Sequence, residues 1–478
     1  MNNNDNILDK IFLELKELRV EVVSLKKENK LLKDENKKLK EIINKNSTNS
    51  SKPPSTDNGF KNSESNKNRS TKAKKRGGQK GSTTNNLKKV DTPDKIEILE
   101  IDNCKNCNHT LKDIDAHSIS TKQEFDIPKI KMEVTEYQQH TKVCPCCHTV
   151  NKPQFPEHLK SHVQYGDNIK TFIGYLNTYQ MVPYERISEL VKDFTSHSIS
   201  VGTINNMLRS FHSKLESYEI KIKELLLKSE VINVDETGTR VKDTLHWTHT
   251  VSTNQLTYYM IHKNRGAKAM DDMEILPQYT GIAVHDHWGA YIKYLCSHSF
   301  CNAHYLQELT SITENENVLW TKDIHKLLTN MNNYIYTLKE NNKTSPSKRK
   351  LQHYYKEYDT ICSSALKYYP SPPDSSTKRK PKQSKGKNLL DRFIKYKDET
   401  LRFFVNLLVP FTNNLAERDL RMIKVKEKIS GTFASFKGAE MFNRIRGFIS
   451  TMKKNGKSVL SELANVLKGK AYIPVVGC

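Results

Sequence analysis

The N-terminal segment carries a regular apolar repeat. Two registers with a seven-residue spacing are visible in it, one formed by Ile11, Leu18, Leu25, Leu32 and Leu39, and the other by Leu15, Val22, Asn29, Asn36 and Ile43. A repeat of this length predicts a coiled coil. The buried amides of Asn29 and Asn36 would fix the register and favour a parallel dimer. A single amphipathic helix packed on the body of the protein is the alternative interpretation.

Residues 160–228 show the period of helices. An apolar helical stretch around Ile187 is followed by a polar break at residues 196–200, and a second stretch runs from Val201 to Phe211. This arrangement is compatible with a helix-turn-helix region that binds DNA. An ordinary helical hairpin fits the pattern equally well, because periodicity does not separate recognition from packing.

Beyond Lys228 the period changes to that of strands. The segments EVINVDETGTRV, LHWTHTVS, LTYYMIHK and TGIAVHDHWGAY are short, rich in β-branched and aromatic residues, and separated by turn residues. The following FCNAHYLQELTSI returns to a helical pattern, so a mixed α/β sheet is expected. Between about 320 and 400 the pattern is helical with basic loops. We interpret this span as a helical insertion whose loop at 371–388 either follows DNA or stays unbound.

Composition adds a strong positive charge to this picture. The 478 residues include 77 Lys and Arg against 54 Asp and Glu, a formal charge of +23, which favours a polyanionic partner. Residues 47–95 are rich in Ser, Asn, Lys, Pro and Gly and predict a flexible linker. The most basic part of this linker is suited to phosphate contacts and includes Lys72, Lys74, Lys75 and Arg76. A solvated linker without a partner is the alternative.

No apolar run approaches the length of a membrane span, and the N-terminus lacks the apolar region of a signal peptide. We therefore expect a cytoplasmic protein without a membrane partner. Four of the nine cysteines form two C-x2-C pairs, Cys104 with Cys107 and Cys144 with Cys147. Paired knuckles of this type predict a structural Zn2+ site. A redox-active pair is the alternative, but no βαβ pattern surrounds these cysteines.

Three acids stand out as candidates for metal chemistry. Asp235 follows the apolar run of residues 231–234, and Asp286 follows a similar run at 282–284. Each acid alone could belong to an Asx turn or to the surface, but two acids at two strand ends can meet in space. Glu417 lies on a predicted helix that begins after Pro410 with Thr412 or Asn413 as its cap. On that helix Glu417 shares a polar face with Asn413, Asn414 and Arg421, although an ordinary surface ion pair is the alternative.

These motifs together resemble the transposases of the insertion sequence 66 family. The resemblance rests on VDETGTRV, HDHWGAY, CNAHYLQEL and NNLAERDLRMIKVKEKISGTF, preceded by the cysteine knuckles and the leucine repeat. It covers nearly the whole chain and is most specific around Glu417. The resemblance implies a ribonuclease H-like fold in which Asp235, Asp286 and Glu417 form a DDE triad. Cys301 and His304 are similar to a C-x-x-H element of related transposases, although a packing role is equally compatible.

The implied chemistry is phosphodiester cleavage and strand transfer on double-stranded DNA. Two Mg2+ ions, or Mn2+, about 3.5–4 Å apart would serve this chemistry and prefer oxygen ligands such as the three acids. Asn414 and Arg421 would support the site, while Arg418 and Lys424 could hold phosphates. We expect the enzyme to act at the nucleoid on element ends and target DNA, as a homodimer joined through residues 11–43, with accessory proteins as further candidate partners.

The predicted order of parts follows from these assignments. It comprises a coiled coil at 1–46, a basic linker at 47–95, a zinc-binding module at 96–155, a helical region at 160–228, a catalytic domain at 229–455 and a C-terminal tail at 456–478. Two other functions remain open from the sequence. One is a metal-dependent nuclease or resolvase that cuts without joining, and the other is a non-enzymatic, zinc-containing DNA-binding regulator.

Overall fold

The computed structural model describes residues 3–46, 49–50, 87–316, 318–369 and 383–475. The chain divides into two compact units, and the smaller one contains Glu64–Phe155 with Glu189–Ser198. Each unit is described by itself. Residues 370–382 of the predicted basic loop and most of the predicted basic linker lie outside the described residues, including Lys72, Lys74, Lys75 and Arg76.

The N-terminal repeat forms one long helix, α1 (Asn3–Ile43). From Leu15 on, the apolar side chains of its heptad positions face solvent in the single chain, with Leu18, Leu25 and Leu32 each more than half exposed. A helix with such an apolar stripe is unstable in water unless another surface covers the stripe. No helix within the described residues is both long and apolar enough to cross a membrane.

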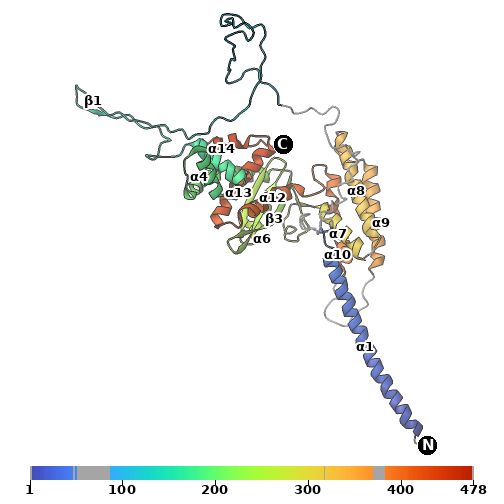
Figure 1. Ribbon diagram of the computed structural model, residues 1–478. Coiled ribbons are helices and arrows are strands. Elements are labelled where there is room, and N and C mark those ends of the chain that lie inside the picture. The colour runs from blue at the N-terminus through green and yellow to red at the C-terminus, as the bar shows by residue number, and fades with distance from the viewer. Residues whose placement is uncertain (1–2, 47–48, 51–86, 317, 370–382, 476–478) are drawn as a thin grey trace. The chain divides into compact units, whose positions relative to one another are not determined.

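A five-stranded mixed sheet forms the centre of the larger unit (Figure 1). Its strands are β3 (Val231–Val241), β4 (Thr244–Ser252), β5 (Thr257–His262), β6 (Ile282–His285) and β7 (Ser297–Phe300). The strand order is β5-β4-β3-β6-β7. The first three strands are antiparallel, whereas β6 and β7 run parallel to β3. The chain is therefore of the mixed α/β class, as the change of period predicted.

Two C-terminal helices pack on the antiparallel half of this sheet, α12 (Asn414–Ser430) and α13 (Phe436–Lys454). They share one apolar cluster with β3 and β5, to which Ile261, Ile423 and Phe442 belong. The segment between the two helices adds to the sheet, because the Phe433 N–H donates to the Arg240 carbonyl at 3.0 Å. The C-terminal end of α12 is thereby held beside the end of β3.

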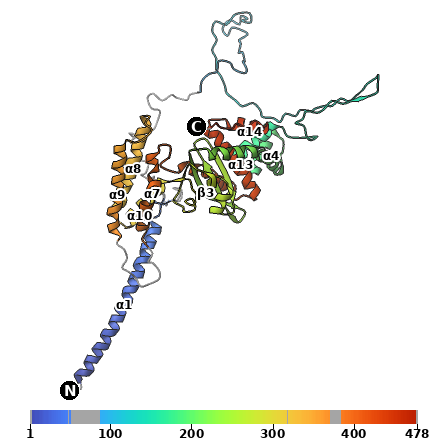
Figure 2. The same cartoon turned by 180° about the vertical axis from the view of Figure 1, so that it is seen from behind.

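The span between β7 and α12 is helical, as predicted for the insertion. It contains α7 (Asn302–Glu316), α8 (Trp320–Glu340), α9 (Lys348–Ala365), the short η5 (Leu366–Tyr368), α10 (Lys385–Lys395) and α11 (Lys397–Val405). Helices α8 and α9 lie side by side (Figure 2).

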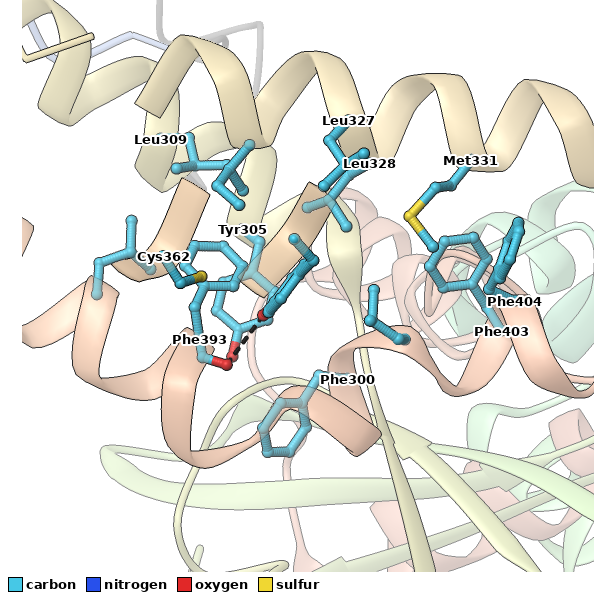
Figure 3. Close-up of a cluster of buried hydrophobic side chains, with 14 of the residues drawn as sticks. Phe300, Tyr305, Leu309, Leu327, Leu328, Met331, Cys362, Phe393, Phe403 and Phe404 are labelled. Carbon is cyan, nitrogen blue, oxygen red and sulfur yellow. Dashed lines mark hydrogen bonds between the residues drawn. The ribbon is translucent and has the colours of Figure 1, made fainter. Parts of the chain in front are cut away.

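The insertion shares its core with the sheet (Figure 3). Phe300 of β7 belongs to the same buried cluster as Leu327 and Met331 of α8 and Phe403 of α11. The Tyr358 hydroxyl inside this cluster donates to the Phe393 carbonyl at 2.9 Å, so its polar atom is satisfied. The insertion is thus built into the fold rather than attached to it.

The region 160–228 is helical, as predicted, and contains α2 (Asp167–Gly174), the π-helical turn η3 (Tyr175–Tyr179), α3 (Tyr184–Thr195), α4 (Val201–Lys214) and α5 (Glu216–Leu227). Ser200 caps α4 by accepting a hydrogen bond from the Thr203 N–H at 3.1 Å. Ile204, Leu208 and Phe211 of α4 are buried, so this face of the helix packs within the fold.

The segment predicted as a C-terminal tail contains a further helix, α14 (Val459–Leu467). It packs against α2, α4 and α13, and Leu463 is fully buried. The prediction missed this helix because its nine residues are short for a periodicity argument. The remaining short elements of the larger unit are α6 (Ala267–Asp272) and η4 (Leu276–Gln278).

Candidate active site

Two of the three predicted acids follow paired positions of adjacent parallel strands. Asn233 of β3 pairs with Val284 of β6, and each acid comes two residues later, Asp235 on β3 and Asp286 after β6. Because both strands run in the same direction, this register brings the two acids to the same level of the sheet. The sequence suggested that Asp235 lies at the end of its strand. In the structure it does not, because β3 continues to Val241 along β4. It lies where the pairing with β6 stops.

The third acid, Glu417, lies in the first turn of α12. Asn413 precedes this helix and ties it to β3. Its side-chain amide donates to the Val234 carbonyl at 2.8 Å, and its side-chain oxygen accepts from the Asn233 amide at 2.8 Å. These bonds place the helix start beside the residue that precedes Asp235.

Asn413 also contacts Cys301, the residue after β7, through a backbone N–H that donates to the Cys301 Sγ at 3.1 Å. Its side chain makes no capping bond to the helix, contrary to the cap predicted from the sequence, because both polar atoms are used by β3. Asn414, the neighbour that was predicted to support the site, is exposed. Of these two neighbouring amides, the one bonded to β3 is that of Asn413.

The pKa of Asp235 reflects both its burial and the charges of nearby acids. Burial raises the pKa of Asp235 to about 8, and the charges of Glu236, Asp286 and Glu417 act in the same direction. The Glu236 backbone N–H opposes this by donating to Asp235 Oδ1 at 2.9 Å. Poorly solvated carboxylates of like charge disfavour joint ionisation unless a cation joins them.

Asp286 belongs to a turn as well as to this group. Its Oδ1 accepts a hydrogen bond from the Trp288 N–H at 2.9 Å, which is the Asx turn considered as the alternative. The turn does not exclude a site role, because it fixes the carboxylate while leaving Oδ2 available. The two interpretations of Asp286 are thus compatible.

Cys301 and His304 lie beside Glu417. Ligand atoms of these three side chains are all within 4.8 Å of one another, and Cys301 Sγ is 4.0 Å from Glu417 Oε1. Among the described residues no other set of three metal-type side chains is this tight, so the three predicted Mg2+ ligands are spaced more widely. Proximity to Cys301 raises the pKa of His304 to about 9, and the charges of Glu417 and Asp286 contribute.

The basic residues predicted around Glu417 differ in their surroundings. Arg418 and Arg421 are exposed on α12. Lys424 is also exposed but pairs with Glu427 at 3.0 Å and contacts the Gly238 carbonyl. A contact between Lys424 and DNA would therefore have to compete with these partners.

The cysteine knuckles have the same local geometry. In the first, the Cys104 N–H donates to the His109 carbonyl at 2.8 Å, and the Asn108 N–H donates to the Cys104 carbonyl at 2.9 Å. In the second, the Cys144 N–H donates to the Thr149 carbonyl and the His148 N–H to the Cys144 carbonyl, both at 2.9 Å.

The backbone of the two knuckles matches as well. Asn108 and His148 occupy equivalent positions, and both have positive φ, at 61° and 57°. A bridge between Asn103 and Thr110 closes the first turn, and β1 (Lys142–Val143) with β2 (Val150–Asn151) closes the second. The module therefore contains one turn twice, forty positions apart, as the equivalence of Cys104 and Cys144 shows.

The thiols within each knuckle interact. Hydrogen bonds from the backbone of Cys107 and Asn106 lower the pKa of the Cys104 thiol, and the Cys107 side chain adds to this. Thr149 has the same effect on the pKa of Cys147, with a contribution from Cys144. Groups that favour the thiolate also favour metal binding, because Zn2+ binds the deprotonated sulfur.

Comparisons with known proteins match three parts of the chain. Residues 102–148 match the zinc-finger binding domain of transposase IS66, which supports a structural zinc. Residues 8–88 match a family of unknown function. The search of curated proteins found no match to the chain. Residues 162–441, more than half of the chain, match the family described as Transposase IS66 family. The chain thus belongs to the IS66 family of transposases.

Proposed function

We propose that the chain is a DDE-type transposase that cleaves and joins DNA strands at Asp235, Asp286 and Glu417. The observation that supports this proposal is that the charges of Asp286 and Glu417, from two remote segments, both act on the carboxyl group of Asp235. Asp235 and Asp286 follow paired strand positions, and Glu417 lies on α12. The strand order β5-β4-β3-β6-β7 supports a ribonuclease H-like fold for the catalytic domain at 229–455. Its helical insertion about 320–400 would lie between the second acid and the third.

The donor set fits divalent metal ions. The three acids offer hard carboxylate oxygens, which Mg2+ and Mn2+ prefer. Within the described residues none of the three forms an ion pair, whereas their neighbours Glu236 and Asp419 pair with Arg265 and Lys454. When bound, two such ions would activate the attacking oxygen and neutralise the leaving oxygen.

The chain's own residues have separate tasks in this reaction. Asp235, Asp286 and Glu417 would together hold the ions. Asn413 would keep Glu417 in reach of the sheet through its bonds to β3. The Trp288 N–H would orient Asp286. His304 beside Glu417 would limit the negative charge of the site before the ions and the DNA arrive.

We further propose that Cys104, Cys107, Cys144 and Cys147 hold one structural Zn2+. The duplicated turn supports this, because two equivalent C-x2-C knuckles supply the four thiolates of a tetrahedral site. A small module with little buried surface gains most of its stability from such an ion.

The same proposal extends to the partners. The exposed apolar stripe of α1 supports a homodimer joined through residues 11–43. The basic linker, α3 with α4, and the exposed Arg418 are proposed to contact double-stranded DNA at the element ends and the target. Accessory proteins could join this assembly, which would act on the nucleoid in the cytoplasm.

An assay with end-labelled element DNA separates this function from its alternatives. The full-length protein with Mg2+ should yield joined products, whereas a nuclease or resolvase would yield cleaved products only. A DNA-binding regulator would only retard the DNA on a gel. If Asp235→Asn retained full joining activity, the catalytic assignment of this acid would be wrong.

A further inference from the structure

Glu236 follows Asp235 directly but takes no part in the acid group. Neighbouring residues of a strand point to opposite faces, so Glu236 lies on the face away from Asp235. Its side chain is almost completely buried, and its Oε1 accepts hydrogen bonds from Arg265 Nε at 2.9 Å and Nη2 at 2.8 Å. The Tyr291 hydroxyl donates to Oε2. Both carboxylate oxygens of Glu236 are thus occupied by protein groups.

Arg265 is held in a fixed plane. Its guanidinium lies over the ring of Trp288 at 4.3 Å and over the ring of Trp247 at 4.8 Å. Cation–π contacts of this kind orient the planar group without saturating its N–H donors. Two of its three nitrogens donate to Glu236. Within the described residues no hydrogen bond uses Nη1.

The charge of this pair is unevenly exposed. The Arg265 side chain is 43% exposed, whereas that of Glu236 is only 1% exposed. The Arg265 guanidinium is therefore accessible to solvent, whereas the Glu236 carboxylate is not. A guanidinium that is already oriented loses little entropy when it binds a phosphate oxygen.

Trp288 joins this arginine to the acid group. Its backbone N–H holds the Asp286 carboxylate at 2.9 Å, and its ring carries the Arg265 guanidinium. A DNA strand whose phosphate lies against Asp286 would therefore pass close to Arg265.

Arg444 shows how a purely structural arginine of this chain is built. It also donates through Nε and Nη2 to a glutamate, Glu219, at 2.8 and 3.2 Å. Its Nη1, however, is used by the His212 carbonyl at 3.1 Å, and its side chain is only 16% exposed. Arg265 differs in both respects, since its third nitrogen and its surface remain available.

We infer that Arg265 is a DNA-contact residue that binds a backbone phosphate next to the acid group, and that Glu236, Trp247 and Trp288 position it. The inference rests on the proposed function for the location of the DNA. It adds a phosphate-binding residue from the segment after β5, which lies outside the three acid-bearing segments.

The test measures binding of a fluorescent mixed-sequence duplex to the full-length, zinc-loaded protein over a range of salt concentrations. Ca2+ replaces Mg2+ so that no strand is cut. For Arg265→Gln we expect binding about ten-fold weaker at low salt, as for loss of one charged hydrogen bond. The slope of log Kd against log salt should fall by about one, as for loss of one phosphate contact.

Arg444→Gln is the matched control, because it removes the same charge and the same type of glutamate pair. It should leave the salt slope unchanged. Glu236→Gln should keep or strengthen binding, since it removes the negative partner while the stacked guanidinium stays. If Arg265→Gln unfolds because Glu236 is left unpaired, the double variant Glu236→Gln with Arg265→Gln replaces it in the binding assay.

An unchanged salt slope in folded Arg265→Gln, or an equal loss in Arg444→Gln, would overturn the inference. This failure is distinguishable from failure of the proposed function. A wild-type protein that binds DNA but never cleaves it with Mg2+ would contradict the transposase activity and leave the result for Arg265 in place.

Discussion

The cysteine knuckles are held by hydrogen bonds between residues four and five positions apart, such as Cys104 with Asn108 and His109. The start of α12, which carries Glu417, is instead tied to Cys301 and β3 by bonds of Asn413 that span 112 to 180 positions. The two regions therefore depend on metal in different ways. A knuckle has local turns but little core, so an ion must supply its stability. The acid group is mounted on a buried core, so it should keep its shape without ions.

The apolar residues beside the cysteine knuckles and those beside the acid group also differ in their exposure to solvent. Val143 and Val150, which flank the second knuckle, are 59% and 63% exposed. Ala283 and Val284, which lead to Asp286, are fully buried. Apolar residues that pack against a core contribute about 1.5–3 kcal/mol each, and exposed ones contribute little. The stability of the sheet is therefore independent of zinc in this account.

The largest expected effect is the loss of structure around the knuckles when zinc is removed. Chelation should unfold residues 102–151, since structural zinc contributes about 10–16 kcal/mol in small modules. The thermal transition of the sheet should stay in place. Hydrogen exchange of both regions with and without chelator measures this, and a joint loss of protection would contradict the comparison.

The second effect concerns catalysis. Asp235→Asn, Asp286→Asn and Glu417→Gln should each reduce strand cleavage by at least about a thousand-fold, because each removes a ligand of the ions that stabilise the transition state. Circular dichroism should show an unchanged fold. Asp243→Asn is the control, because it changes an exposed acid in the turn that follows β3. Normal cleavage by any of the three site variants would remove that residue from the site.

The third effect tests the tether between α12 and the sheet. Asn413→Ala removes two side-chain hydrogen bonds and leaves the buried Asn233 amide without its partner. We expect a loss of about 2–3 kcal/mol in the free energy of unfolding, together with weaker metal binding. The neighbouring exposed Asn414→Ala should change neither quantity. Equal effects of the two variants in urea titrations would show that the tether is unimportant.

The smallest effect is a gain in stability. The pKa of Asp235 is raised to about 8 in the folded, metal-free protein. Between its ordinary pKa and this value, the Asp235 carboxyl group is protonated in the folded protein and ionised in the unfolded chain. Its contribution to stability is full below pH about 4 and is lost as the pH rises to about 8. Asp235→Asn should remove this loss and stabilise the metal-free protein at pH 8 by about 1 kcal/mol. A difference between variant and wild type that does not depend on pH would contradict the assignment.

The sequence predicted the features that depend on local pattern. The heptads predicted α1, the apolar spacing after Pro410 predicted α12, and the two C-x2-C pairs predicted the knuckles. It did not predict that β3 continues past Asp235, because β4 determines the strand length. It named Asn414 as a supporting residue, whereas the amide that bonds to β3 is that of Asn413, since only the position of β3 decides which amide is buried.

Arg265 was also missed, for a similar reason. It lies in the polar turn HKNRGAK, where a basic residue looks like any solvated charge. Its two rings and its carboxylate come from β4, the loop after β6, and β3. A signal of this type exists only in three dimensions.

The most direct test of the central claim is anomalous diffraction from crystals of the protein soaked in Mn2+, with DNA bound. We expect Mn2+ between the carboxylates of Asp235, Asp286 and Glu417, with Glu236 still bound to Arg265. A map with no Mn2+ among these acids, or with Glu417 turned away from the sheet, would contradict it.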